Sequence, residues 1–335
     1  MADYKAIKGH HIETVAGDPS VLQAGDIWYN STLGKVRVHK LGAGAWSSGA
    51  NNPAPSSLAF VGAFGTATAG VWVGGYVDDA SYSDATLEYD GTSWTEGNDL
   101  PGTFAAGASG TGIGTLTAGL LCGWYHSTAP HGYLDDTLEY DGTNWTAGGD
   151  LPIGAGDGNS SGTQTAGLYI TGTSGFPTSR TDQSCEYNGT SWTAGNAVNT
   201  IRLRAAGNQV GIQTAGMLVG GNPPSNTPVI NVEHYDGTNW SEGTDINTAR
   251  GNGGGNGIST AAIAYGGGTP SAIGNTESYD GTSWTEVADL STARIGHRGA
   301  GGGVNTSALT TGGTTVATTE VWDGAPLATS NVGTT

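Results

Sequence analysis

The spacing of the tryptophans constrains this chain most. Six of them recur at intervals of 48, 51, 47, 48 and 44 residues, at Trp46, Trp94, Trp145, Trp192, Trp240 and Trp284. The last five each close the same phrase, in which a tyrosine is followed by Asp-Gly or Asn-Gly, two small polar residues and the tryptophan. A repeat of roughly 40 to 50 residues built from short strands is typical of one blade of a β-propeller.

Each repeat contains the parts of a four-stranded sheet. The phrase from tyrosine to tryptophan predicts a hairpin that sets Tyr89 opposite Trp94, because Asp-Gly tolerates the positive φ of a tight turn. An apolar run bounded by glycine precedes each hairpin, as in residues 68–75, and predicts a buried strand. A glycine-dense segment, such as residues 251–257, fits an innermost strand where sheets converge. Together with the tryptophan strand, these segments make four strands per repeat.

The glycine doublet, followed by a tyrosine and then a tryptophan, resembles the kelch repeat over residues 42–335. Six doublet strands are present but only five complete hairpins, because Leu327 stands where the sixth tryptophan is expected. We expect Trp46 to supply the missing outer strand. The chain is therefore predicted to be all-β, a six-bladed kelch-like β-propeller whose ring is closed by an N-terminal strand, with seven blades as the alternative.

The composition of the chain limits the kinds of partner that it is expected to bind. The 335 residues carry a net charge of −18, and residues 42–335 contain no lysine and six arginines against 25 acidic residues. Such a body repels nucleic acid and anionic membranes, so we expect neither as a partner. No apolar run approaches the roughly 20 residues of a membrane-spanning helix, so no membrane insertion is expected. Cys122 and Cys185 fall in strands of different repeats, which predicts buried free thiols rather than a disulfide.

Residues 1–41 do not follow the repeat. Residues 25–30 and 35–39 alternate polar and apolar side chains, which predicts a hairpin. His10 and His11 lie in the arm ahead of it, but neighbouring residues alternate faces on a strand and no third ligand is evident. We therefore expect no metal site. The predicted domains are residues 1–41, an arm and hairpin that anchors or docks the protein, and residues 42–335, the propeller.

A second resemblance involves the start Met-Ala-Asp-Tyr-Lys, residues 25–32, residues 45–49 and the strand opening at residues 211–216. These segments look like virion proteins of marine tailed bacteriophages, and the match spans nearly the whole chain. The resemblance implies a tail-fibre-like or structural protein of the phage particle, made in the host cytoplasm. It also implies contacts with other virion proteins through residues 1–41 and a homo-oligomeric state in the particle.

The loops between the second and third strands of each repeat vary most, so we place recognition there. Aromatic rings beside carboxylates suit sugars, because a ring stacks on the apolar face of a pyranose and a carboxylate accepts hydroxyl protons. The predicted ligand-binding residues are Tyr76, Asp79, Tyr82, Trp124, Tyr125, His126, His131 and Tyr133. In the alternative interpretation the aromatic residues only hold the loops to the body. Calcium at the acidic pairs is a further alternative, although no defined calcium-loop spacing is present.

Arginine and glutamate occur together in the last three repeats and are both missing at those positions in the first three. This joint occurrence predicts one structural ion pair per repeat, since the arginine fork matches a carboxylate. The predicted pairs are Arg202 with Glu233, Arg250 with Glu277 and Arg294 with Glu320. An arginine cluster that grips an acidic ligand is the alternative.

The sequence contains no evident set of nucleophile, base and orienting residue, so we predict no catalytic residues, no cofactor and no enzyme activity. The predicted function is a non-enzymatic phage virion protein that presents its loops to a host-surface glycan or protein. A capsid-decoration or tail-fitting protein without receptor binding is the alternative function.

Overall fold

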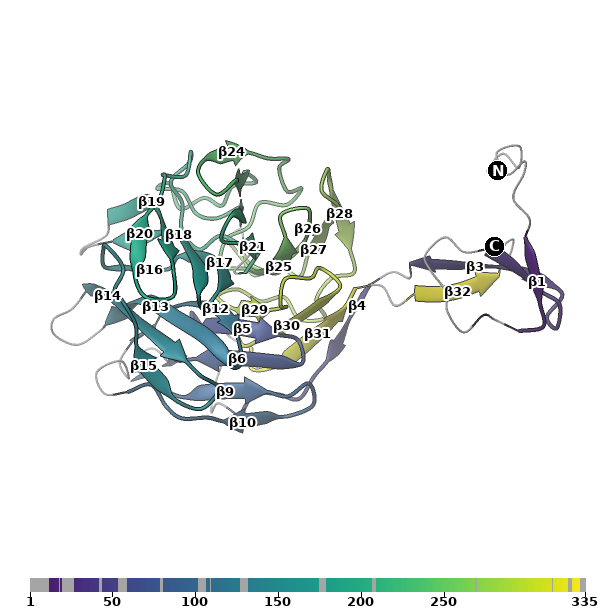
Figure 1. Ribbon diagram of the computed structural model, residues 1–335, viewed down its shortest axis with the longest axis horizontal. Coiled ribbons are helices and arrows are strands. Elements are labelled where there is room, and N and C mark those ends of the chain that lie inside the picture. Colours follow the sequence, from purple (N-terminus) through teal and green to yellow (C-terminus); the bar gives the residue numbers. More distant parts are fainter. Residues whose placement is uncertain are drawn as a thin grey trace. The chain divides into compact units, whose positions relative to one another are not determined.

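The protein is described by a computed structural model in which all regular structure is β-strand, so the all-β class is confirmed (Figure 1). The chain divides into two compact units: unit 1, with residues Met1–Gly44 and Gly324–Thr335, and unit 2, with residues Ala45–Asp323. The structure describes residues 12–17, 19, 27–41, 44–53, 59–78, 81–101, 107–108, 110–126, 132–174, 179–206, 209–268, 270–314, 316–324 and 327–331.

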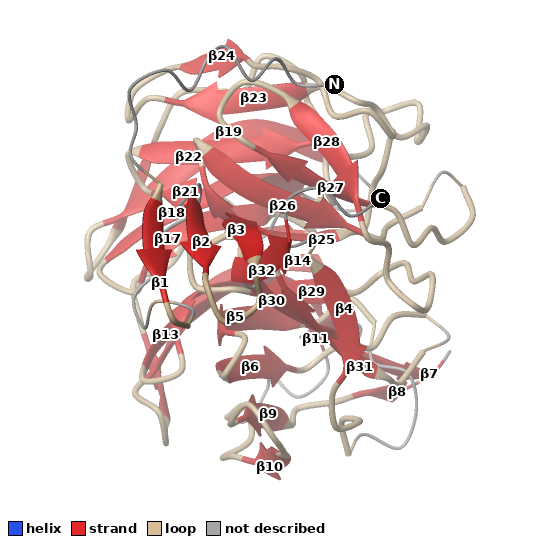
Figure 2. Cartoon of the chain, turned by 90° about the vertical axis from the view of Figure 1, so that its right-hand side faces the viewer, coloured by secondary structure: helices blue, strands red, loops and turns tan. Residues whose placement is uncertain are grey.

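Unit 1 contains one four-stranded sheet in the order β1 (Glu13–Val15), β2 (Ile27–Asn30), β3 (Lys35–Leu41) and β32 (Leu327–Asn331) (Figure 2). The predicted hairpin is confirmed, because β2 pairs with β3 in antiparallel fashion. Strand β32 pairs with β3 on its other side. The last residues of the chain therefore join the N-terminal unit, whereas the predicted boundary had assigned them to the propeller. The predicted role of this part of the chain in docking stays a prediction.

Unit 2 contains six sheets of four or five strands, formed in chain order. The first three sheets are β10 (Trp94–Glu96), β9 (Thr86–Tyr89), β6 (Ala69–Val73) and β5 (Gly62–Thr66); then β11 (Gly107–Ala108), β12 (Thr111–Thr115), β13 (Ala118–His126), β14 (Gly132–Tyr140) and β15 (Trp145–Ala147); then β16 (Ala155–Gly156), β17 (Asn159–Thr163), β18 (Ala166–Ser174), β19 (Ser179–Tyr187) and β20 (Trp192–Ala194).

The last three sheets of unit 2 have four strands each. They are β21 (Gly211–Ile212), β22 (Ala215–Val219), β23 (Val232–Tyr235) and β24 (Trp240–Glu242); then β25 (Gly254–Ile258), β26 (Ala261–Tyr265), β27 (Thr276–Tyr279) and β28 (Trp284–Val287); then β29 (Arg298–Ala300), β30 (Ser307–Thr311), β31 (Thr319–Asp323) and β4 (Ala45–Ser48). A separate two-stranded sheet consists of β7 (Tyr76–Asp78) and β8 (Ser81–Tyr82).

The prediction of a six-bladed kelch-like propeller closed into a ring is wrong. Seven separate sheets of four or five strands form, together with the two-stranded sheet, and none of the sheets within the described ranges is closed. Strands hydrogen-bond within a sheet, while the first strands of successive sheets in unit 2 meet by packing. One of the seven, the sheet β1–β2–β3–β32 of unit 1, is built from the two ends of the chain. These ends do not contain the repeat, so a count of repeats does not include this sheet. One local pairing is as predicted, because β4 joins β31 and places Trp46 opposite Trp322.

The repeated aromatic residues join each sheet to its neighbour. Each tryptophan lies opposite its tyrosine across the hairpin, as Trp94 lies opposite Tyr89. Several indole N–H groups donate to a hydroxyl of an adjacent sheet: Trp145 to Thr86 (2.9 Å), Trp192 to Thr137 (2.9 Å) and Trp46 to Thr276 (3.0 Å). The tyrosine hydroxyls extend the same connection, from Tyr187 to Glu139 (2.6 Å) and from Tyr235 to Glu186 (2.7 Å). Packing and polar contacts therefore act at the same sheet-to-sheet boundaries.

The three predicted ion pairs form, and they are buried. The nitrogen–oxygen distances are 2.6 Å for Arg202 with Glu233, 2.7 Å for Arg250 with Glu277 and 2.6 Å for Arg294 with Glu320. Every one of these side chains is at most 1% exposed. Each glutamate also accepts backbone N–H groups from the segment that leads into its sheet. These arginines are therefore parts of the interior and are not accessible to a ligand.

Candidate functional site

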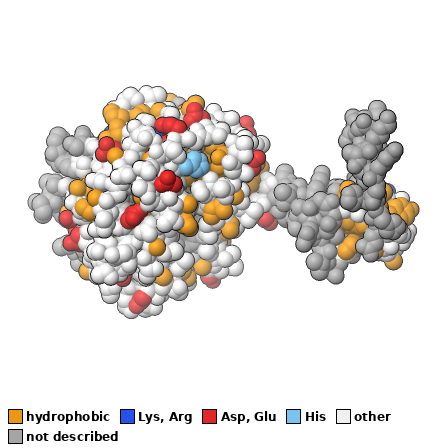
Figure 3. Space-filling model, turned by 45° about the horizontal axis from the view of Figure 1, so that its top comes forward, with side chains coloured by type: hydrophobic (Ala, Val, Ile, Leu, Met, Phe, Trp, Pro, Cys, Tyr) orange, Lys and Arg blue, Asp and Glu red, His pale blue; other side chains and the backbone are white. Residues whose placement is uncertain are grey.

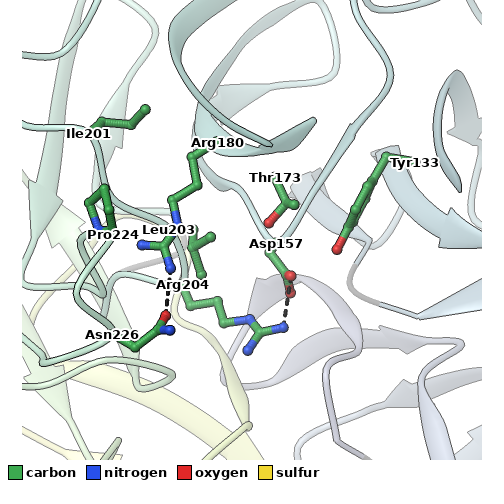
Figure 4. Close-up of a pocket in the computed structure, with 9 residues that line it drawn as sticks. All are labelled: Tyr133, Asp157, Thr173, Arg180, Ile201, Leu203, Arg204, Pro224 and Asn226. Atoms are coloured by element: carbon green, nitrogen blue, oxygen red, sulfur yellow. Dashed lines mark hydrogen bonds and ion pairs between the residues drawn. The ribbon is translucent and has the colours of Figure 1, made fainter. Parts of the chain in front are cut away.

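Two adjoining pockets lie in unit 2, and they share Tyr133, Asp157 and Arg204. The larger, here called the arginine pocket, has a volume of about 480 Å³ and is drawn in Figure 4. It is lined by Tyr133, Asp157, Thr173, Arg180, Ile201, Leu203, Arg204, Pro224 and Asn226. The smaller, here called the tyrosine pocket, has a volume of about 180 Å³ and is lined by Phe60, Tyr76, Tyr82, Tyr125, Tyr133, Asp157 and Arg204.

Two strand pairs position the tyrosines. Tyr76 lies opposite Tyr82 in the pair β7–β8, with ring centroids 4.6 Å apart and the two hydroxyls 3.0 Å apart. Tyr125 lies opposite Tyr133 where β13 and β14 extend beyond the rest of their sheet, with centroids 5.4 Å apart. Each ring limits the rotation of its partner, since edge-to-face and offset aromatic pairs are favourable. The tyrosine pocket thus has walls that are ordered before a ligand arrives.

A relay of backbone hydrogen bonds connects Phe60, Arg204 and Asp157, three of the residues that line the pockets. The N–H of Phe60 donates to Gly296 (2.8 Å), that of Gly296 to Asn252 (3.0 Å), that of Asn252 to Arg204 (2.6 Å) and that of Arg204 to Asp157 (3.0 Å). All five residues have positive φ values, between 53° and 76°. Left-handed backbone at four residues other than glycine is strained, and such strain tends to occur at functional sites. Four of the five lie two residues ahead of an inner strand: Phe60 before β5, Asp157 before β17, Asn252 before β25 and Gly296 before β29. Arg204 lies two residues ahead of the isolated bridge between Ala206 and Val219.

Arg204 and Asp157 form the polar centre of the site. The Nη2 atom of Arg204 lies 2.8 Å from Oδ2 of Asp157, and its guanidinium carbon lies 4.9 Å from the centroid of the Phe60 ring. Burial alone lowers the pKa of Arg204, but the Asp157 carboxylate offsets this, and the net shift is upward. Asp157 is 1% exposed, and its second oxygen, Oδ1, has no hydrogen-bond partner among the described residues. This oxygen is buried, so Asp157 acts on the pocket through its ion pair with Arg204 and through its charge.

Arg180 reaches the arginine pocket from β19 and donates to two neutral acceptors. Its Nη1 donates to the Asn222 carbonyl (2.5 Å) and its Nη2 to Oδ1 of Asn226 (2.5 Å). Burial and, secondly, repulsion by Arg204 lower the pKa of Arg180. Figure 4 shows Arg180 and Arg204 on the same side of the pocket, with the Tyr133 hydroxyl pointing toward Asp157. The pocket therefore presents guanidinium groups on one side and a phenol on the other.

The predicted ligand-binding residues divide into three groups. Tyr76, Tyr82, Tyr125 and Tyr133 all line the tyrosine pocket, so the structure brings half of the predicted set together. Trp124 and His126 are 3% and 8% exposed, and Trp124 belongs to a hydrophobic cluster between sheets. Their burial contradicts a direct role in ligand contact, because the extended β13 turns these two side chains inward. Asp79 and His131 lie outside the described residues.

The sequence analysis missed the polar half of the site. It did not select Phe60, Asp157, Arg180 or Arg204, which together line the two pockets. One signal was available, because Arg204 and Arg180 do not occur at the repeated positions of the paired arginines. Such departures from the repeat mark residues that the scaffold itself does not require.

The described part of the chain offers neither a metal site nor a membrane-spanning helix. It contains no cluster of three or more His, Cys, Asp or Glu side chains arranged to hold a metal ion. It also contains no helix with the length and hydropathy needed to cross a membrane. Cys122 and Cys185 are both buried and form no disulfide, in agreement with the prediction.

Comparisons with known proteins bear on the fold alone. No protein-family model and no curated protein sequence matches the chain. Many solved structures do, among them the structure of YjhT, which has a TM-score of 0.66 at 13% sequence identity. The match covers 82% of this chain and 95% of YjhT. The chain therefore has a fold of the β-propeller type. Since such folds carry many unrelated functions, the function has to be argued from the pockets.

Proposed function

We propose that this protein is a non-enzymatic recognition protein that binds a glycan in the joined tyrosine and arginine pockets. The observation that carries this proposal is the convergence of four tyrosines and two arginines on one hollow of unit 2. Concave sites with aromatic walls and a few converging polar groups are the usual form of small-ligand sites.

The two pockets offer complementary chemistry to a sugar. Tyrosine rings pack against the apolar C–H face of a pyranose, while their hydroxyls exchange hydrogen bonds with its hydroxyl groups. The guanidinium groups donate to ring or hydroxyl oxygens, and the buried Asp157 carboxylate holds the Arg204 guanidinium group in the site.

The biological setting that we propose is the particle of a tailed bacteriophage, where the protein is a tail-fibre-like appendage facing the host. This step depends on the sequence resemblance described above. Unit 1 supplies a surface suited to contact with other virion proteins, since Ile27, Tyr29 and Leu33 are 41%, 37% and 51% exposed. Ile27 and Tyr29 point to the same side of β2, opposite its buried residues.

A glycan array tests the recognition function. Fluorescently labelled full-length protein is applied to printed bacterial surface polysaccharides, and we expect retention on a subset of them. Tyr125→Ala should weaken this retention at least tenfold, because it removes one wall of the tyrosine pocket. Tyr29→Ala, the same substitution in unit 1, is the control and should retain binding. Absence of retention on every glycan, or equal retention by the Tyr125→Ala protein, would refute the proposal.

A structural virion part without receptor binding is the second candidate, and the exposed apolar residues of β2 and its turn favour it. In this case Ile27→Ser and Leu33→Ser should prevent incorporation into particles, while Tyr125→Ala should leave particle assembly and adsorption to cells unchanged. Immunogold electron microscopy of intact particles, combined with an adsorption assay, distinguishes the two candidates.

A further inference from the structure

The arginines of residues 42–335 fall into two sets of three. Arg202, Arg250 and Arg294 are each paired with a glutamate in the interior. The other set consists of Arg180, Arg204 and Arg298. Arg180 and Arg204 line the arginine pocket. Arg298 interacts electrostatically with Arg204 and Asp157 of the same pocket.

In the described part of the chain, the charge of one carboxylate, that of Asp157, acts on all three members of the second set. Its ion pair with Arg204 already uses one of its oxygens. Arg180 donates to a carbonyl and to an amide oxygen, which leave its charge uncompensated. Three guanidinium groups beside one carboxylate give this part of the described structure a local excess of positive charge, although the protein as a whole carries −18.

Arg298 is the most unusual of the three, because it is 1% exposed and has no carboxylate partner in the described part of the chain. Its Nε and Nη2 atoms have no hydrogen-bond partner, and Nη1 makes one long contact of 3.5 Å with the His297 carbonyl. Burial lowers its pKa to about 10, while Asp157 raises the pKa and Arg204 lowers it. A buried, uncompensated cation is costly, so a structure that retains one gains from a nearby anion.

We propose that the ligand is an anionic sugar, whose acid group lies against Arg180 and Arg204 while its ring packs against the tyrosine pocket. This inference rests on the proposed recognition function and names the class of glycan. The fork of a guanidinium group pairs two N–H donors with two oxygens of a carboxylate, sulfate or phosphate. Arg298 lies deeper and contributes its charge without touching the ligand.

The acidic surface of the protein sharpens this expectation. Acidic side chains are scattered over the face of unit 2 that Figure 3 shows, so an anionic ligand meets general repulsion on approach. A neutral sugar would not offset the excess positive charge of the arginines in this pocket. Attraction must therefore be local, and added salt should weaken binding by screening the exposed part of the Arg180 contact.

The test uses pairs of sugars that differ only in the group at C6, which is acidic in one member and a neutral hydroxymethyl group in the other. Isothermal titration of the full-length protein compares methyl glucuronide and methyl galacturonide with methyl glucoside and methyl galactoside, and glucose 6-phosphate with glucose. We expect at least one acidic sugar to bind tenfold or more tightly than its neutral parent. The arm that shows this preference identifies the acid group as a carboxylate or a phosphate.

Two variants of one residue separate charge from structure. Arg180→Gln should abolish the preference for the acidic sugar, so that the acidic sugar and its neutral parent bind the variant with equal affinity. Arg180→Lys should restore part of the preference, since it returns the charge without the fork. Arg37→Gln in unit 1 is the control for the change in net charge, and thermal unfolding verifies that each variant folds.

The outcomes separate this inference from the proposed function. Equal binding of acidic and neutral sugars would overturn the inference and leave glycan recognition standing. A preference that survives Arg180→Gln would overturn it as well. Failure of every acidic sugar to bind, together with retention of neutral polysaccharides on the array, would also refute it. Failure in both assays would refute both proposals.

Discussion

Replacing Glu277 by glutamine tests how the interior of unit 2 is held together. Glu277 has no measurable exposure and accepts four hydrogen bonds. They come from the Asn247 backbone N–H (2.7 Å), the Asn247 side-chain amide (2.8 Å), the Thr248 backbone N–H (2.9 Å) and Nη2 of Arg250 (2.7 Å). The carboxylate thus joins the strand β27 to the segment that leads into its sheet.

The expected loss for Glu277→Gln is about 3–5 kcal/mol of unfolding free energy, the range for removing one partner of a buried ion pair. Counting contacts gives a similar value. The glutamine amide turns one acceptor oxygen into a donor that faces other donors, so two hydrogen bonds are lost. At about 1.5–3 kcal/mol for each bond to a charged group, this amounts to roughly 3–6 kcal/mol. Arg250 also keeps its charge without compensation.

Replacing both partners should not restore stability. An isolated buried ion pair can often be exchanged for apolar residues without loss. Here Glu277→Leu with Arg250→Met leaves the N–H groups of Asn247 and Thr248 and the carbonyl of Asn275 without their present partners. Three half-buried groups at about 1 kcal/mol each leave a deficit of roughly 3 kcal/mol.

Urea unfolding of the full-length chain, followed by tryptophan fluorescence, measures these losses. Glu286→Gln is the matched control, because Glu286 lies directly opposite Glu277 on β28 and is exposed. Its loss should stay within about 0.5 kcal/mol. A loss below about 1 kcal/mol for Glu277→Gln, or recovery of native stability in the double variant, would contradict this account of the ion pairs.

Three further predictions follow from buried groups in unit 2. Burial and nearby arginines hold the pKa of His297 well below 6.5, so below that pH the unfolded state binds a proton that the folded state does not. The free energy of unfolding should therefore fall as the pH drops below about 6.5, by up to about 1.4 kcal/mol per pH unit. Equal pH slopes for the native and His297→Asn proteins in urea unfolding would contradict this. Cys122 and Cys185 should not react with a thiol reagent until the protein unfolds, because both side chains are fully buried. Burial also raises the pKa of both thiols, that of Cys185 to about 12. Rapid reaction of the native protein would contradict this prediction. Gly112→Ala should lower the free energy of unfolding by about 1–3 kcal/mol in the same assay, since a Cβ there would lie 2.5 Å from the Ala63 carbonyl oxygen of the neighbouring sheet. An unchanged urea midpoint would refute this close approach.

Much of the local structure was predictable because it repeats. The hairpin that sets Tyr89 opposite Trp94 follows from turn chemistry, and the pairing of Trp46 with Trp322 follows from counting hairpins. The same count failed for the whole assembly. It treated residues 42–335 as one ring and left no place for a sheet made from both ends of the chain, although β3 and β32 form one. A count of repeats describes what recurs and carries no information about segments that do not.

The candidate site shows why its two halves differed in predictability. The tyrosines stand in loops whose length and aromatic content depart visibly from the other repeats, so Tyr76 and Tyr125 were found. Asp157 and Arg204 lie 47 residues apart and meet only because a relay of backbone hydrogen bonds aligns equivalent positions of successive sheets. Each is an ordinary charged residue in the sequence. Their significance depends on which charges are paired after folding, and that is a property of the packed interior. Glutamates neutralise three of the six arginines in residues 42–335. The other three share the charge of one carboxylate, that of Asp157.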